Sequence, residues 1–239
     1  MSRDTTDPPE VYCEWGLMGL SAGLPRAAAV VIVDVLSFST SVDIAVGRGA
    51  RVYPFRGSPA EAEALAQQRG AMLASRDRHR GFSLSPRSML GIPPDASLIL
   101  PSPNGGLLSA STGIVPTFCG CLRNAAVVAR AAAAHGAPVL VVAAGERWPD
   151  GSLRPGAEDW LGAGAIIHGL PGLRSPEAAL AEAAFLAGRG DLIGLLQRSD
   201  SGQELIGRNC AADVVLAAEL DVSGIAPRLI EGAFQAAED

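Results

Sequence analysis

The apolar run Ala27-Ala-Ala-Val-Val-Ile-Val33 leads directly into Asp34, and the hydroxyl-rich stretch Leu36-Ser-Phe-Ser-Thr-Ser41 follows it. A run of this length is typical of a buried strand, and the stretch after Asp34 is typical of a loop that enters a helix. In open α/β sheets, ligands bind where strands end and helices begin. A carboxylate beside several hydroxyls at such a place suits a metal ion and an anion together.

The same pattern recurs at residues 138–164. The run Pro138-Val-Leu-Val-Val-Ala-Ala144 leads into Gly145, and a loop then carries Glu158 and Asp159 toward another helix. Two such strand ends predict one acidic site that accepts phosphate. Two plainer interpretations stay open: Asp34 simply ends a strand in solvent, and Glu158 and Asp159 form an acidic pair favoured by the helix macrodipole.

The alternation of strand-like and helix-like segments predicts an α/β fold with three layers, α/β/α, around a mostly parallel or mixed sheet. Strands are expected at 11–15, 27–33, 50–55, 71–74, 97–100, 115–118 and 138–143. Helices are expected at 59–69, 122–135, about 159–168, 176–188, 190–198 and 200–219. We expect one domain over residues 1–239, with a helix-rich C-terminal extension at about 173–239. The strands at 27–33 and 138–143 are expected to end on the same side of the sheet.

Composition narrows the class of protein. The chain has 239 residues, 48% hydrophobic and 5% aromatic residues, and a formal charge of −6. The negative charge argues against general nucleic-acid binding, which requires a basic surface. No stretch approaches 18 consecutive apolar residues, and the N-terminus is polar, so we expect neither a membrane span nor a signal peptide. A soluble cytoplasmic protein is the expectation.

The cysteines and histidines are scattered. Cys119 and Cys121 form a lone C-x-C without a second pair at zinc spacing, so buried free thiols are expected rather than a zinc site. The histidines have no partner at ligand or catalytic spacing, and we expect structural roles for them.

Four stretches, collinear over about residues 28–230, resemble the 2-phosphosulfolactate phosphatase family, the magnesium-dependent enzymes of coenzyme M biosynthesis. The four are Val31-Ile-Val-Asp34-Val35-Leu36, Asn104-Gly105, Gly120-Cys-Leu-Arg-Asn124-Ala125, and Ala143-Ala-Gly145 through Glu158-Asp159 and Gly162-Ala-Gly164. The resemblance implies a phosphatase that converts (2R)-2-phospho-3-sulfolactate to 3-sulfolactate and phosphate. It also implies a homo-oligomer.

The chain departs from the family's pattern at three places where an anionic substrate should be held. The family's arginine after Asp-Val-Leu is Ser37 here, and its Asn-Gly-Thr is Asn104-Gly105-Gly106. The Gly-Asn of its Gly-Phe-x-x-Gly-Asn-Ser-Pro segment is missing from residues 81–88. Since arginine is the preferred partner of such anions, these losses alter specificity or weaken catalysis unless another cation replaces it. The candidates for this replacement are Arg76, Arg78, Arg80 and Arg87.

The expected chemistry follows from these residue types. A phosphatase must neutralise the phosphoryl group and deliver water in line, and Mg²⁺ held by carboxylates serves both needs. Asp34, Glu158 and Asp159 are the candidate catalytic and metal-binding residues, with Asp159 the firmer choice of the pair because one carboxylate must face inward while its neighbour points away. Candidate substrate contacts are Ser37, Ser39, Thr40, Asn104, Gly105, Arg123, Asn124 and Gly145.

Alternatives remain for these contacts. Ser39 and Thr40 could be helix caps, Asn104-Gly105 a simple turn, and Arg123 a surface charge. The cysteine-phosphatase pattern Cys-x5-Arg and the Asp-x-Asp nucleophile pattern are both absent, which favours direct attack by metal-activated water. A rival hypothesis is a catalytically weak relative that binds an anionic metabolite as a sensor or scaffold.

Overall fold

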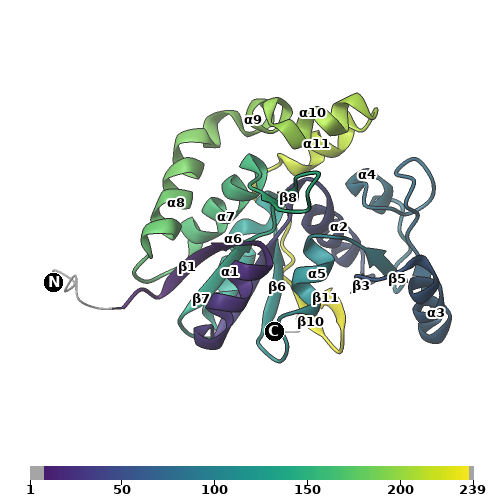
Figure 1. Cartoon of the computed structure of the whole chain (residues 1–239), viewed down its shortest axis with the longest axis horizontal. Helices are drawn as coiled ribbons and strands as arrows, with labels where there is room; N and C mark the ends of the chain where they lie inside the picture. Colours follow the sequence, from purple (N-terminus) through teal and green to yellow (C-terminus); the bar gives the residue numbers. More distant parts are fainter. Residues whose placement is uncertain (1–7, 237–239) are drawn as a thin grey trace.

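The computed structural model describes residues 8–236, and a nine-stranded mixed sheet forms its centre (Figure 1). The spatial order is β1 (Val11–Trp15), β7 (Val139–Ala143), β2 (Ala29–Val33), β6 (Thr117–Gly120), β10 (Pro227–Ile230), β11 (Ala233–Ala236), β3 (Arg51–Phe55), β5 (Ser97–Pro101) and β4 (Met72–Leu73). The four neighbouring strands β1, β7, β2 and β6 pair in parallel, and so do the three strands β3, β5 and β4. The β10–β11 hairpin joins the two groups through antiparallel pairs.

Helices cover the sheet on both faces. The α-helices are α1 (Gly16–Gly23), α2 (Thr40–Gly47), α3 (Pro59–Arg69), α4 (Pro86–Met89), α5 (Gly105–Ala110), α6 (Ala125–Ala133), α7 (Ala157–Gly169), α8 (Pro176–Gly188), α9 (Leu192–Arg198), α10 (Asp200–Gly207) and α11 (Ala211–Ala217). A π-helical turn, Val35–Ser39, precedes α2, and a separate hairpin of β8 (Glu146–Arg147) and β9 (Leu153–Arg154) follows β7. Within the described residues, no helix is long and apolar enough to cross a membrane.

The two apolar runs form adjacent central strands. Every residue of β2 and β7 is buried, and the strands pair in parallel up to Val33 opposite Ala143. In β2, Val31 and Val33 pack in the cluster that contains α6 and α7, whereas Val30 and Ile32 pack with Leu20 of α1 and Leu108 of α5. Burial on both faces explains why these strands read as continuous apolar runs. The structure confirms the α/β fold class and the shared direction of these strands.

The C-terminal part is helix-rich, as expected, with α8 to α11, but it does not end in helices. Its last segments, β10 and β11, are strands inserted between β6 and β3. They form because the backbone of these neighbouring strands supplies hydrogen bonds, and the sequence of such short segments does not reveal this pairing. The helix expected at 200–219 is two helices, because the chain turns between them at Asn209, whose φ is 60°. The turn expected at 101–106 leads directly into α5, and α1 was not expected.

Close packing of α7 on α8 sets the position of the segment that carries Glu158 and Asp159. A Cβ at Gly164 would overlap the carbonyl oxygen of Ala181 and lie 2.8 Å from Cβ of Phe185. We therefore predict that Gly164→Ala lowers the free energy of unfolding by about 1–3 kcal/mol in urea denaturation, the usual cost of overpacking. Gly190→Ala is the matched control, since a Cβ there meets no atom within 4 Å. Equal stability of the two variants would show that the α7–α8 contact can relax freely.

Candidate active site

Asp34 lies at the C-terminal end of β2 and begins the π-helical turn. Its carboxylate accepts the backbone N–H groups of Phe38 at 3.3 Å and Gly105 at 2.9 Å. A Cβ at Gly105 would lie 2.6 Å from Cγ of Phe38 and 3.0 Å from Oδ2 of Asp34, so only glycine allows the start of α5 to approach this closely. Single π-turns of this kind occur often at functional sites.

Asp159 links the ends of β2 and β7. Its Oδ1 accepts the N–H of Val35 at 2.7 Å, and its Oδ2 accepts the N–H of Gly145 at 2.8 Å. The predicted meeting of the two strand ends is therefore present, and Gly145 takes part through its backbone. Both oxygens of Asp159 therefore already accept hydrogen bonds from the main chain.

Glu158 and Glu146 complete a group of four carboxylates. Both Glu158 and Asp159 are buried, so the expectation that only one of the pair faces inward was wrong. Oε2 of Glu158 is buried and has no hydrogen-bond partner among the described residues. Oε2 of Glu146 accepts from Nδ2 of Asn104 at 2.9 Å, which connects the β8–β9 hairpin to the turn before α5.

Burial and mutual repulsion shift the protonation of these groups. Burial, and then the charge of Glu146, raise the pKa of Asp34 to about 7 although two backbone N–H groups oppose the shift. Burial, and then the charges of Asp34 and Glu158, hold the pKa of Asp159 well above its usual value. Burial chiefly raises the pKa of Glu146 as well. The group holds more negative charge than its surroundings neutralise, which suits it to bind a cation or exchange protons.

The carboxylate oxygens of this group suit Mg²⁺ when water and substrate supply the remaining ligands. In residues 8–236, no group of three or more His, Cys, Asp or Glu side chains is arranged to hold a metal by itself. Mg²⁺, however, is usually held by one or two carboxylates together with water and substrate phosphate. The unpartnered oxygen of Glu158 fits that type of site. Each oxygen of Asp34, like each oxygen of Asp159, accepts one N–H group and keeps a second lone pair for a cation.

Two of the expected substrate hydroxyls are occupied within the π-helical turn. Oγ of Ser39 accepts from the N–H of Asp34 at 2.9 Å, and Oγ1 of Thr40 donates to the carbonyl of Val35 at 2.6 Å. Both side chains are fully buried, so neither caps α2 nor faces a ligand. The half-buried Ser37 is different, because its hydroxyl accepts from a guanidinium N–H of Arg78 at 3.1 Å. Of the four candidate replacement arginines, Arg78 is therefore the one that contacts Ser37.

Arg123 and Asn124 serve the fold rather than the carboxylate group. Arg123 pairs with Asp43 at 2.9 Å and with Glu219, and so connects α2 to the segment after α11. Asn124 is fully buried, accepts from the N–H of Cys121 and donates to the carbonyls of Cys119 and Ile225. These contacts correct the expectation that both residues touch substrate. All four cysteines are buried free thiols, as expected.

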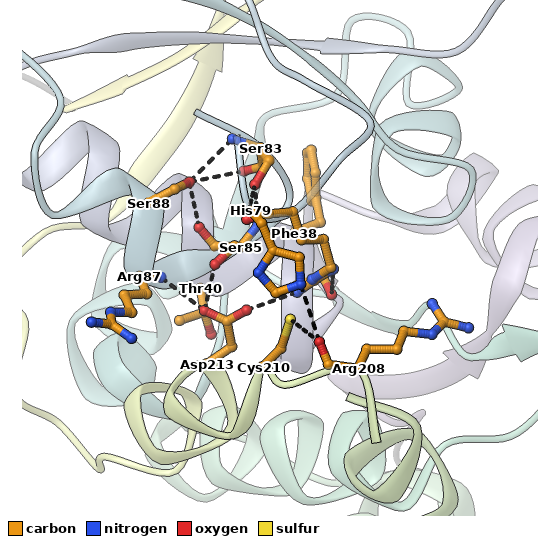
Figure 2. A network of polar contacts seen from close by, with 12 residues as sticks. Phe38, Thr40, His79, Ser83, Ser85, Arg87, Ser88, Arg208, Cys210 and Asp213 are labelled. Carbon is orange, nitrogen blue, oxygen red and sulfur yellow. Dashed lines mark hydrogen bonds and ion pairs between the residues drawn. The ribbon is translucent and has the colours of Figure 1, made fainter. Parts of the chain in front are cut away.

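Sequence reasoning missed Glu146 and Asp213. Glu146 is the second residue after the apolar run at 138–144, a position that could have been suspected by analogy with Asp34. Asp213 carried no such signal, because it lies inside a helix-like segment and gains its partners only through folding. It accepts from Ser85 and from the N–H of Arg87 (Figure 2). It also accepts from the guanidinium of Arg78.

Comparisons with known proteins identify the family. The profile of the 2-phosphosulpholactate phosphatase family matches residues 20–232. A "Probable 2-phosphosulfolactate phosphatase" of Synechococcus sp. is 31% identical over 239 aligned residues, which cover 88% of this chain and 91% of that protein. A protein of the same description from Gloeobacter violaceus is 41% identical over 71 residues, a local match that covers 30% of each chain.

The raised pKa of Asp34 predicts a pH-dependent stability. Because the folded protein keeps this proton where the unfolded chain has lost it, ionisation of Asp34 lowers the free energy of unfolding as pH rises from about 4 to 7, by up to about 1.4 kcal/mol per pH unit. Asp34→Asn should remove this slope, so its stability relative to the unchanged protein should rise between pH 5 and pH 8. Urea denaturation in the presence of a chelator measures this. Glu63→Gln, an exposed carboxylate of α3, is the control. Parallel pH profiles for Asp34→Asn and the unchanged protein would contradict the shift.

Proposed function

The chain belongs to the 2-phosphosulfolactate phosphatase family, and from that premise we propose that it hydrolyses (2R)-2-phospho-3-sulfolactate to 3-sulfolactate and phosphate. The observation that supports the activity most strongly is the convergence of four carboxylates where β2 and β7 end. This reaction would place the protein in the biosynthesis of coenzyme M, as the resemblance implies.

We propose Mg²⁺ as the cofactor, held by Asp34 and Glu158. When bound, the ion supplies positive charge that neutralises the transferring phosphoryl group. Asp159 would orient both ligands rather than bind the ion, because it fixes the backbone after β2 and after β7.

The carboxylates with raised pKa are suited to move protons. We propose that Glu146, oriented by Asn104 and favoured in its protonated form by burial, gives a proton to the leaving oxygen of the substrate. Asp34, as a ligand of the ion, would not also serve as the base; the positive charge of Mg²⁺ would instead lower the pKa of the attacking water. The oxygen of the attacking water would approach the phosphorus atom opposite the departing oxygen, in line with the bond that breaks.

A cysteine nucleophile does not suit this site. Cys119 lies on β6, next to β2, and Cys121 follows directly after that strand. Both are fully buried, and burial chiefly raises the pKa of both thiols far above neutrality. Neither would be a thiolate under ordinary conditions, and a thiolate is the reactive form. Direct attack by water is the proposed route.

We also infer a homo-oligomer, as the resemblance implies. Helix α8 leaves Leu180 and Leu186 exposed, which would suit contact with a second copy. The catalytic proposal does not depend on this assembly, because all four carboxylates come from one chain.

Removing the charge of Asp34 tests the proposed activity. We predict that Asp34→Asn lowers Mg²⁺-dependent phosphate release by about 10²-fold or more, because the metal supplies several kcal/mol of transition-state stabilisation. Glu158→Gln should have a similar effect, while Glu63→Gln leaves the rate unchanged. Circular dichroism checks that each variant is folded. Full activity in Asp34→Asn would refute this mechanism and leave the acidic strand ends with a structural role.

A further inference from the structure

A basic cavity lies beside the π-helical turn. Its volume is about 650 Å³, and it lies between the end of β3, the loop that follows β4, the turn after β5 and the end of α10. Its charged lining consists of four arginines and a histidine against one aspartate: Arg56, Arg76, Arg78, Arg208, His79 and Asp77. In a chain with a net charge of −6, such a concentration of guanidinium groups marks a place for an anion.

Arg78 is the best-fixed cation of this cavity. One of its terminal nitrogens donates to Oγ of Ser37 at 3.1 Å, and the other donates to Oδ2 of Asp213 at 3.2 Å. Its Nε is buried without a hydrogen-bond partner among the described residues, and its side chain is 16% exposed. Each terminal nitrogen carries a second N–H, so this guanidinium, oriented at two points, keeps donors for an anion that approaches from the cavity.

Asp213 sets that orientation. It lies in the first turn of α11 and is 1% exposed. Its Oδ1 accepts from Oγ of Ser85 at 2.7 Å and from the N–H of Arg87 at 3.0 Å (Figure 2). One carboxylate therefore holds the loop at Ser85 and Arg87 as well as the side chain of Arg78. His79 adds a contact at 3.2 Å to the carbonyl of Arg208. The loop that carries the arginines is therefore fastened to the C-terminal helices.

The cavity borders the carboxylate group. Ser37, which Arg78 contacts, belongs to the same π-helical turn that Asp34 begins. On the other side, the lining residues Ser102 and Pro103 lead directly into Asn104 and Gly105, which contact Glu146 and Asp34. A small molecule could therefore place one end near the carboxylates and the other among the arginines.

We propose that this cavity binds the sulfonate end of the substrate, and that Arg78, positioned by Asp213, is the guanidinium that holds it. This inference rests on the proposed phosphatase function. The carboxylate group repels an anion, so a substrate with several negative charges needs cations close to it. Arginine binds planar or tetrahedral oxyanions with two donors, which a lysine does not match.

The test compares two substrates. 2-Phosphosulfolactate carries the sulfonate, and 2-phospholactate lacks it. We predict that Arg78→Gln raises KM for 2-phosphosulfolactate roughly 10- to 100-fold, the usual cost of losing a hydrogen bond to a charged group, with a smaller change in kcat. The KM for 2-phospholactate should change much less. The double variant Ser37→Arg with Arg78→Gln should recover most of the lost affinity.

Two variants serve as controls. Arg80→Gln lies in the same loop, but its side chain is 84% exposed and pairs only with Asp77, so its kinetics should match the unchanged protein. Arg208→Gln removes an exposed arginine of the cavity without disturbing Asp213, and it should raise KM for the sulfonated substrate even if Arg78→Gln folds poorly. If Arg78→Gln and Arg208→Gln both behave like Arg80→Gln, the cavity is not the subsite. An equal loss with both substrates would overturn the assignment to the sulfonate.

Calorimetric titration with 3-sulfolactate separates this inference from the phosphatase activity, because binding needs no turnover. We expect Arg78→Gln to weaken binding as much as it raises KM. If no substrate is hydrolysed and 3-sulfolactate still binds in an Arg78-dependent manner, the subsite is supported and the proposed function fails. If phosphate is released and binding is indifferent to Arg78, the subsite fails and the function is supported.

Discussion

The hydrogen bonds that Asp159 accepts from the N–H groups of Val35 and Gly145 are the contacts on which the site depends. Parallel pairing of β2 with β7 brings two chain segments to one edge, but it does not fix how they leave the sheet. Asp159 fixes both, from the first turn of α7. Asp34 lies just before one of these donors and Glu146 just after the other, so their spacing follows from a single buried carboxylate. Burial of this carboxylate without hydrogen-bond donors would lower the free energy of unfolding. The carboxylate and the two backbone segments therefore stabilise each other.

That arrangement concentrates four carboxylates in a buried region, although such a cluster lowers the stability of the fold. Asp34, Glu146, Glu158 and Asp159 gather in a buried place, and burial, followed by repulsion among them, raises the pKa values of Asp34, Glu146 and Asp159. Groups arranged against stability in this way are typical of functional sites. The arginine-rich cavity next to the π-helical turn supplies the opposite charge. The two regions together can take a molecule with a phosphoryl group at one end and a strong acid at the other.

The sequence predicted what depends on burial and on strand direction. The runs at 27–33 and 138–143 became the central strands because both faces are covered, and their shared direction brought Asp34 and Asp159 together. What depends on particular backbone donors could not be predicted. Ser39 and Thr40 look like ligands in sequence, yet the π-helical turn uses both hydroxyls. Arg78 reaches Ser37 across 41 residues of chain, so the sequence could name it only as one of four candidates. The strands β10 and β11 form because neighbours offer unpaired backbone, which short segments do not reveal.

The central claim is that this carboxylate group hydrolyses a phosphomonoester with the help of a divalent cation. The most direct measurement is phosphate release by the purified protein from 2-phosphosulfolactate, 2-phospholactate and phosphoglycolate, with Mg²⁺ and with a chelator. The account predicts release that requires Mg²⁺ and is fastest with the sulfonated substrate. Binding of these compounds without release of phosphate from any of them would contradict it, and would identify the protein as a sensor or scaffold that has kept the shape of the site.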